Sequence, residues 1–357
     1  MPLNPEKEGF HDTGQSKDGS MTQINIDEVK RVSAELSTHR LPQIEIPRTS
    51  AALTKNRADI QKLLKSYFDK TGLAVDKLNK LTATRQTERR KLFATQVAER
   101  AKNLHGAEIG FRQAMENRRE ALQVLSRPFQ STFVILDKPF LIWELPHPED
   151  IFQDQHYESL NSSIKISADK HAGGEIGTLF TFYFQWRNDS QFTAVVNVRT
   201  SLVLNGICEV ISGPGIFSGH HNALFLTGIL ALIRWIGWGT DPTTGASNDQ
   251  TDFPLPQPTQ ILNVASLDAQ GGGLFGDSDM KEQEFNFQPF GLSCDQIAIP
   301  AGATIVFEVS LLVQWGIEDP GGDFDDVIID FAFDKLGHRV ICPLVALELL
   351  TRPALTT

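Results

Sequence analysis

The sequence changes character at Pro128, and this change limits what the chain can fold into. Residues 51–126 carry 16 Lys and Arg against 8 Asp and Glu, a net charge of +8. Residues 127–357 carry 11 Lys and Arg against 28 Asp and Glu, a net charge of −17. The first stretch has helical spacing and the second has strand-like alternation. We therefore predict an α+β protein by segregation. A long N-terminal helix or coiled-coil arm precedes an antiparallel β-sandwich, jelly-roll-like domain.

Three segments follow from this division. Residues 1–50 are polar and are expected to form a flexible N-terminal tether. Residues 51–126 form the basic helical or coiled-coil arm, and residues 127–357 form the acidic antiparallel β-sandwich head. Because residues 1–20 contain no apolar run, we expect no signal peptide. The expected location is a virion, or the extracellular space after non-Sec release, and otherwise the cytoplasm.

The basic segment carries apolar residues at spacings of three, four or seven. They form two seams: Leu53, Ile60, Leu64, Tyr67, Ala74, Leu78 and Leu81, then Val97, Ala101, Leu104, Phe111, Met115, Leu122 and Leu125. A continuous helix and a hairpin turning near 82–91, or near Gly72, both fit this pattern. One isolated helix cannot bury either seam, so we expect a homo-oligomer.

The positive charges of this segment have two interpretations. Lys and Arg commonly cover a solvated helix face, and no nucleic-acid motif accompanies Arg89, Arg90 and Lys91. We therefore expect no specific nucleic-acid partner. Alternatively, the basic arm of one subunit contacts the acidic head of a neighbouring subunit.

After Pro128, short apolar runs alternate with turn signals. Phe180, Phe182 and Phe184 alternate with other residues, as in a half-buried strand. Residues 296–299 and 303–315 are predicted strands joined by a Pro-Gly turn. A strand over 192–211 is expected to bend or split at Gly206. The other expected strands cover 132–137, 162–168, 177–186, 259–266, 283–289, 326–333 and 339–350.

One apolar segment, residues 223–238, breaks this alternation. Arg234 is its only charged residue. We consider a central strand or buried helix, an oligomer interface, and a membrane-inserting element. In the last two cases the contact residues are Leu230, Ile233, Trp235 and Trp238, because tryptophan suits a membrane interface.

No motif of a known catalytic or cofactor site is present in the sequence. It has no HExxH, GxSxG, Walker or GxGxxG pattern, and we predict that the protein is not an enzyme. Cys208, Cys294 and Cys342 are interpreted as buried hydrophobes rather than a disulfide framework. We expect no organic cofactor. The candidate metal ligands are Asp319, Asp323, Asp325 and Asp326, with calcium as the ion; the simpler interpretation is a solvated acidic loop.

These observations favour a non-enzymatic structural or attachment protein. In this hypothesis an oligomeric helical stalk carries a β-sandwich binding head, as a virion, fibre or spike-like assembly component. Its partners are further copies of itself, other assembly proteins or a surface receptor. The alternative is a membrane-active, toxin-like protein that uses the helical arm and residues 223–238.

Overall fold

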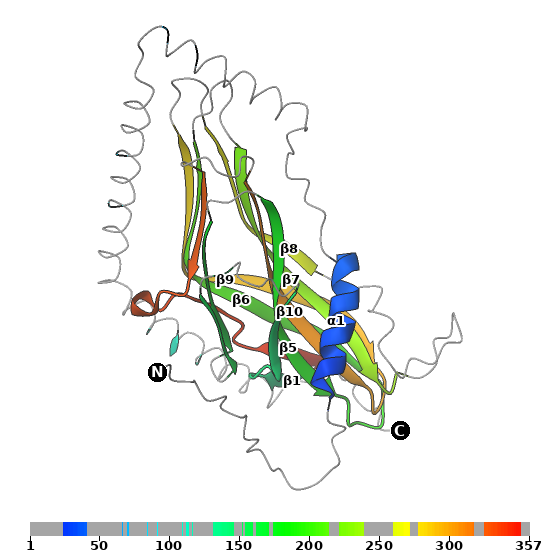
Figure 1. Cartoon of the computed structure of the whole chain (residues 1–357). Coiled ribbons are helices and arrows are strands. Elements are labelled where there is room, and N and C mark those ends of the chain that lie inside the picture. The colour runs from blue at the N-terminus through cyan, green and yellow to red at the C-terminus, as the bar shows by residue number, and fades with distance from the viewer. Residues whose placement is uncertain are drawn as a thin grey trace, which may run out of the picture.

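The computed structural model describes the following residues: 24–40, 131–145, 152, 154–159, 162–170, 174–213, 221–238, 260–271, 278–317, 325–350, and eight single helical positions between 66 and 116. Most of these residues belong to two antiparallel sheets (Figure 1). Among them one α-helix of 15 residues is present, α1, Ile26–Arg40.

Sheet A, as we name the larger sheet, has eight strands in the order β1-β13-β6-β11-β4-β12, with β3 beside β4 and β9 beside β6. Its strands are β1 Ser131–Leu136, β3 Asp154–Glu158, β4 Ser163–Lys170, β6 Ala194–Ser212, β9 Asp279–Ile299, β11 Asp326–Phe331, β12 Arg339–Ile341 and β13 Val345–Leu350.

Sheet B has five strands in the order β2-β5-β10-β7-β8. They are β2 Leu141–Leu145, β5 Gly174–Arg187, β7 His221–Ile236, β8 Gln260–Gln270 and β10 Thr304–Ile317. The expected strands at 283–289 and 296–299 are thus parts of one strand, β9, and residues 339–350 hold two strands.

The eight strands β4 to β11 follow the order of a jelly roll. Chain neighbours lie in different sheets, except for β7 and β8, which pair with each other in sheet B. The resulting orders are β4-β11-β6-β9 in sheet A and β5-β10-β7-β8 in sheet B. All of these pairs are antiparallel. The two sheets pack face to face, as in other two-sheet jelly rolls.

The core lies between the sheets and is almost wholly apolar. The alternation predicted for Phe180, Phe182 and Phe184 is confirmed, because all three rings point into this core. Phe152 packs edge-on against Phe180 and Trp315, with ring centroids 5.1 and 5.7 Å away. Each buried aromatic ring stabilises the fold by about 2–3 kcal/mol through the area removed from water.

Strand β6 organises sheet A. One of its edges pairs with β9, and the other pairs in turn with β13, β12 and β11. The expected split at Gly206 is instead a bulge, where the register with β9 shifts between Leu204 and Gly206. A Cβ atom at Gly206 would collide with the carbonyl of Asp330 and the ring of Phe331, so this close approach requires glycine.

The fold class expected from the sequence is wrong. The described residues are mostly strand, and they contain neither a long N-terminal helix nor a coiled coil. The 15-residue helix α1 falls instead within residues 1–50, which we predicted to be a tether. Its few apolar residues gave no strong periodic signal, because a helix this short depends on the surface it packs against. Both apolar seams of 51–126 lie outside the described residues. Within the predicted turn at 82–91, Thr84 and Lys91 are the described positions, and both are helical.

Candidate interaction site

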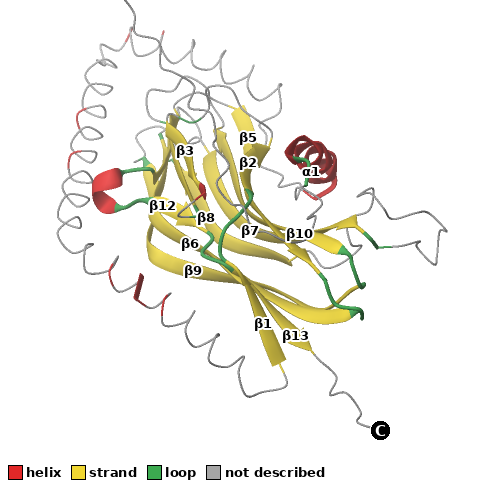
Figure 2. Ribbon diagram, turned by 90° about the horizontal axis from the view of Figure 1, so that it is seen from below, coloured by secondary structure: helices red, strands yellow, loops and turns green. Residues whose placement is uncertain are grey.

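Helix α1 covers part of the outer face of sheet B, which is the face turned away from the core. Figure 2 shows the helix end on, outside the sandwich and close to β2, β5 and β10. Asn25 begins the helix, since its Oδ1 accepts a hydrogen bond of 3.0 Å from the backbone N–H of Asp27. Asp27 and Glu28 in the first turn favour the positive end of the helix dipole.

One side of α1 is apolar and buried. Ile24, Val29 and Val32 pack against four side chains from three strands of sheet B: Tyr183, Ile233, Trp235 and Val306. At the edge of this contact, the Lys30 ammonium lies 5.3 Å from the ring centroid of Trp143 on β2. This cation–π contact adds about 0.5–1 kcal/mol at an exposed site.

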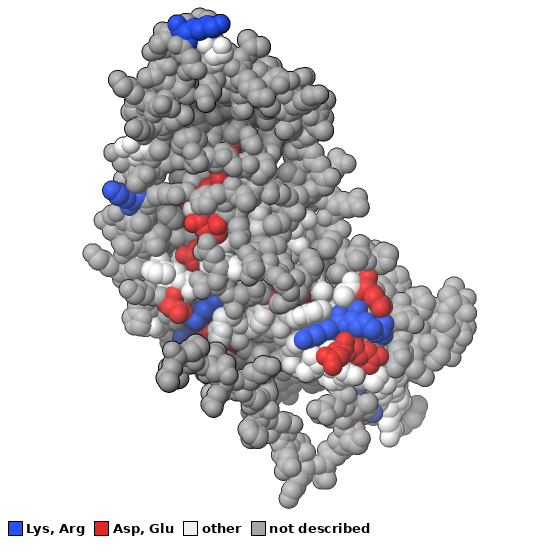
Figure 3. All heavy atoms as spheres, viewed as in Figure 1, with Lys and Arg blue, Asp and Glu red and all other residues white. Residues whose placement is uncertain are grey.

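The opposite side of α1 is charged and faces solvent. The Arg31 guanidinium contacts the Glu35 carboxylate at 2.8 Å, and both side chains are more than half exposed. Figure 3 shows acidic and basic side chains side by side in this region. The apolar contact on one side and the exposed Arg31–Glu35 ion pair on the other determine how the helix is oriented on the sheet.

A buried polar centre lies beneath the middle of α1. Ser33 donates a hydrogen bond of 2.6 Å to Oε1 of Glu308, and its Oγ lies 2.7 Å from the Tyr183 hydroxyl. The single Ser33 hydroxyl proton is used toward Glu308, so Tyr183 donates to Ser33. Glu308 and Tyr183 are directly paired across β10 and β5, and all three side chains are at most 4% exposed.

This arrangement fixes the position of the helix. A carboxylate on the buried face of a sheet is costly without hydrogen-bond donors, and α1 brings one through Ser33. At the next cross-strand pair on the same face, two residues along each strand, the Thr181 and Ser310 hydroxyls hydrogen-bond each other at 2.8 Å. The outer face of sheet B therefore holds α1 in one position through two kinds of contact. One is the apolar contact, and the other is the set of buried hydrogen bonds among Ser33, Glu308 and Tyr183, which we call the polar lock.

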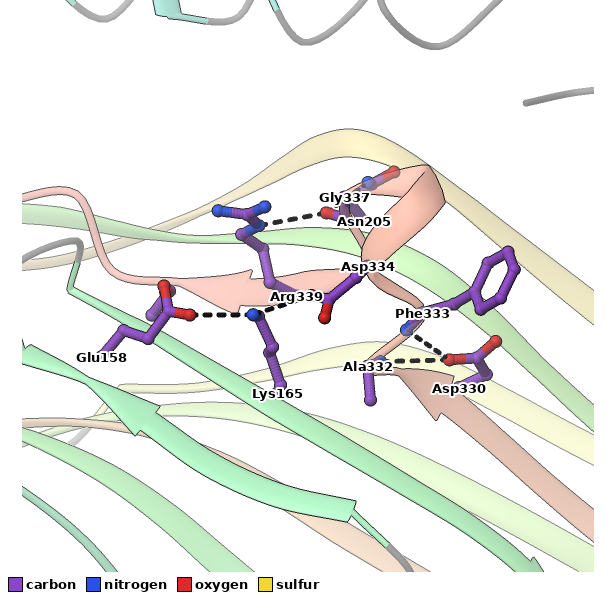
Figure 4. A network of polar contacts seen from close by, with 10 residues as sticks. Glu158, Lys165, Asn205, Asp330, Ala332, Phe333, Asp334, Gly337 and Arg339 are labelled. Atoms are coloured by element: carbon purple, nitrogen blue, oxygen red, sulfur yellow. Dashed lines mark hydrogen bonds and ion pairs between the residues drawn. The ribbon is translucent and has the colours of Figure 1, made fainter. Parts of the chain in front are cut away.

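A second polar network holds the connection between β11 and β12 (Figure 4). Asp330 accepts hydrogen bonds from the backbone N–H groups of Ala332 and Phe333, at 3.0 and 3.1 Å. Nδ1 of the buried His338 lies 3.3 Å from Asp330 Oδ2. Burial alone would raise the pKa of Asp330, but the contacts with His338, Ala332 and Phe333 outweigh it and hold that pKa below its ordinary value.

Lys165 and Asn205 secure the same connection from neighbouring strands. The Lys165 ammonium lies 2.8 Å from both Asp334 and Glu158, and these two carboxylates raise its pKa. The Asn205 amide donates to the carbonyls of Leu336 and Gly337, at 3.0 and 2.8 Å. These contacts anchor the short 3-10 helix η2, Asp334–Leu336, so the network has a structural explanation.

Two of the four predicted calcium ligands, Asp319 and Asp323, lie outside the described residues. Asp325 is buried and accepts hydrogen bonds from the Gly213 backbone N–H at 2.9 Å and the Asn222 amide at 2.8 Å. Asp326 is buried at the start of β11. Within the described part of the chain, no group of three or more His, Cys, Asp and Glu residues could hold a metal ion. The calcium site stays a prediction.

The apolar segment 223–238 forms strand β7 and the two residues after it. Leu230 lies in the core, whereas Ile233 and Trp235 lie beneath α1. Trp238 is partly buried; its Nε1 donates to the Thr304 carbonyl at 2.7 Å, and its ring stacks on the Arg234 guanidinium. Contact of these four residues with a partner or a membrane stays a prediction, and it requires Leu230, Ile233 and Trp235 to leave their buried positions. None of the described helices has the length and apolar character needed to cross a membrane.

The three cysteines are free and buried. Their interpretation as small core hydrophobes is confirmed. Burial raises the pKa of Cys294 to about 11 and of Cys342 to about 12, and it also raises the pKa of Cys208. These thiols are therefore protonated near neutral pH.

The sequence missed the polar centre under α1. Ser33 belongs to a segment that we expected to be a tether, and Tyr183 is one of the residues that alternate with the phenylalanines of β5, to which the sequence analysis gave no role. One signal was available: Glu308 is the only charged residue between Ile305 and Leu312, inside a predicted strand. A single carboxylate in such a run indicates a buried polar contact on one face of the strand.

No protein-family model matches the chain, and no curated protein is similar to it. Among solved structures, the enzymatically active domain of tailspike protein 4 of bacteriophage CBA120 aligns with a TM-score of 0.15 and 10% identity, over 59% of this chain and 19% of that one. The structure of infectious bursal disease virus, Gx strain, aligns with a TM-score of 0.10 and 9% identity, over 64% of this chain and 43% of that one. This chain thus spans under half the length of each, and at this level of similarity no function passes to it.

Proposed function

We propose that this protein is a non-enzymatic structural component of a virion-like assembly and that its jelly roll is the body through which copies make contact. The observation that carries the proposal is the filled interior of the sandwich. Side chains from both sheets, among them Phe182, Phe285, Phe307 and Phe331, close the space between them. Specific contacts are therefore left to the outer faces and the loop ends.

Jelly rolls occur in viral capsids, lectins and cupins, so the fold alone does not choose among these roles. The outer face of sheet B supports a role in assembly. It already binds a helix from a segment far upstream in the chain, through Ser33 and Glu308. A surface built to hold one helix is suited to protein–protein contact, because its buried polar lock gives specificity in addition to apolar area.

The charge division of the sequence supports the same role. Residues 51–126 carry a net charge of +8 and residues 127–357 a net charge of −17. Opposite charges on two parts of one chain favour association between copies as well as within a copy. Homo-oligomerisation is thus part of the proposal.

Negative-stain electron microscopy of the purified full-length chain tests this proposal. We expect discrete particles of uniform size, at micromolar protein concentration and low salt. The same preparation in high salt is the control, because exposed charge contacts are screened beyond about 8–10 Å at physiological ionic strength. A field without particles in every buffer, from protein that is folded by circular dichroism, would overturn the proposal.

A further inference from the structure

We infer that Arg234 of β7 binds the carboxylate group of a ligand, at the end of the sandwich where β5, β7 and β10 meet. The ligand class is a monocarboxylate whose body packs on the tryptophan side chains beside Arg234. The inference goes beyond the proposed assembly function and does not rest on it.

The first argument is that Arg234 lacks the partner that other arginines of the sheets have. Arg187 at the end of β5 lies 3.1 Å from the Asp189 carboxylate. Arg199 of β6 contacts the Asp295 carboxylate. The Nε–H of Arg234 is buried, and within the described part of the chain no atom accepts a hydrogen bond from it. A buried donor of a charged group is costly to leave unsatisfied, so this guanidinium requires an acceptor from a ligand.

The second argument is that a fixed aromatic contact orients the guanidinium. Its carbon lies 5.0 Å from the ring centroid of Trp238. Gly237, with φ of 78°, turns the chain back between the two, and a Cβ atom there would lie 2.9 Å from the Gly302 carbonyl oxygen. The Trp238 Nε1 then donates to the Thr304 carbonyl at 2.7 Å. Stacking orients a guanidinium without using its N–H donors, so the planar group stays available for a carboxylate.

The third argument is the position of Arg234 in the sheet. It pairs across the strands with Ile305 of β10, which pairs with Trp186 of β5, so the three side chains lie in one row. Ile305 belongs to the core, whereas Arg234 is partly exposed. Among the described strands, β8 begins only at Gln260 and leaves the last residues of β7 without a neighbour on that side. A partly exposed cation next to apolar side chains suits a ligand that has an apolar surface beside its charged group.

The charge of the domain selects the kind of anion. A guanidinium binds carboxylates and phosphates alike through two parallel hydrogen bonds. Residues 127–357 carry a net charge of −17. This field repels a phosphate monoester, with a charge of about −1.5 to −2 at pH 7, more strongly than a carboxylate with a single charge. A carboxylate is therefore the favoured ligand group, and sugar acids and peptides are two sources of it.

Ligand-observed NMR titrations of the full-length chain test the assignment with matched pairs of probes. The sugar pair is glucuronic acid and glucose, and the peptide pair is N-acetylphenylalanine and its amide. We expect at least one acid to bind with a Kd of about 1 mM and its neutral counterpart to bind at least about tenfold more weakly. The pair that shows this difference identifies the source of the carboxylate. Inorganic phosphate should compete weakly.

Three variants connect the binding to Arg234. Arg234→Gln should weaken binding of the acid by about tenfold or more, because it removes the charge and the paired donors. Arg187→Gln is the matched control, since it removes the same charge from the same end of the sandwich and should leave binding unchanged. Arg234→Lys keeps the charge without the planar group and should bind the acid less tightly than wild type but more tightly than Arg234→Gln.

Thermal melting without ligand establishes that each variant is folded, and Arg234→Lys provides the test where Arg234→Gln does not fold. Several results would overturn the inference: no acid binds, an acid and its neutral counterpart bind equally, Arg234→Gln and Arg234→Lys bind like wild type, or Arg187→Gln loses as much binding as Arg234→Gln. None of these results bears on assembly, which electron microscopy measures separately.

Discussion

Glu308 of β10 accepts a 2.6 Å hydrogen bond from Ser33 of α1, although 275 positions separate the two residues in the chain. Both side chains are buried, and Glu308 lies on a sheet face that is otherwise mainly apolar. The helix therefore supplies a hydrogen-bond donor to the buried Glu308, and the sheet face buries the apolar side of the helix.

Ser33→Ala is expected to weaken the docking of α1 by about 1–3 kcal/mol, because it removes a donor from a buried carboxylate. Hydrogen exchange of the amides of residues 26–40 measures this directly, and those of β10 should change much less. Arg31→Ala is the matched control, since it removes an exposed ion pair from the same helix, worth about 0.3–0.5 kcal/mol. Equal acceleration of exchange in both variants would contradict the polar lock.

Gly206→Ala is expected to destabilise the sandwich by about 1–3 kcal/mol, because the added methyl group forces β6 away from Asp330 and Phe331. Urea unfolding followed by tryptophan fluorescence measures the loss. Gly291→Ala on β9 is the control, because a Cβ atom there meets no atom within 4 Å. The account of the bulge fails if the two variants unfold at the same urea concentration.

Asp330 is expected to make stability depend on acid pH. Its pKa in the folded protein is below the unfolded value of about 3.9, so the stability it contributes is fully present above that value and is lost as the pH falls through the folded pKa. Asp330→Asn should therefore lower the free energy of unfolding near pH 7, and the difference from wild type should shrink as the pH falls below the unfolded pKa of about 3.9. The measurement is urea unfolding between pH 7 and pH 2.5. Asp189→Asn, in an exposed pair with Arg187, should show little effect, and a difference for Asp330→Asn that stays constant down to pH 2.5 contradicts the assignment.

The three thiols are expected to resist modification in the folded protein. Burial raises their pKa values, so few of the thiols are in the reactive thiolate form at pH 8, and the reagent cannot reach them in the core. A colorimetric disulfide reagent should report almost no reaction in buffer and three thiols in guanidinium chloride. Cys294 should react first, because its side chain is slightly more exposed than those of Cys208 and Cys342. One full equivalent of thiol reacting at once in buffer would show that a cysteine is not buried.

Local patterns predicted the parts of the fold that local physics decides. The alternation of Phe180, Phe182 and Phe184 gave the correct inward face of β5. The Pro-Gly pair gave the correct turn between β9 and β10, where Gly302 adopts a left-handed conformation with φ of 73°. Gly206 was identified as a weak point of its strand, and the structure shows a bulge there.

Contacts between distant residues could not be predicted in this way. Helix α1 carries too little apolar spacing to be recognised alone, and its stability comes from Tyr183, Val306 and Glu308, far along the chain. The division of one edge of β6 among β11, β12 and β13 depends on registers that no single segment encodes. The strong periodic signal of 51–126, by contrast, led us to the wrong fold class.

Sedimentation velocity of the intact chain tests the central claim most directly. The chain has a mass of 39.6 kDa. We predict a discrete species at a multiple of this mass at micromolar concentration, which becomes smaller as salt screens contacts between the basic and acidic parts. A single 39.6 kDa species at every protein and salt concentration would contradict the claim that this protein works by self-assembly.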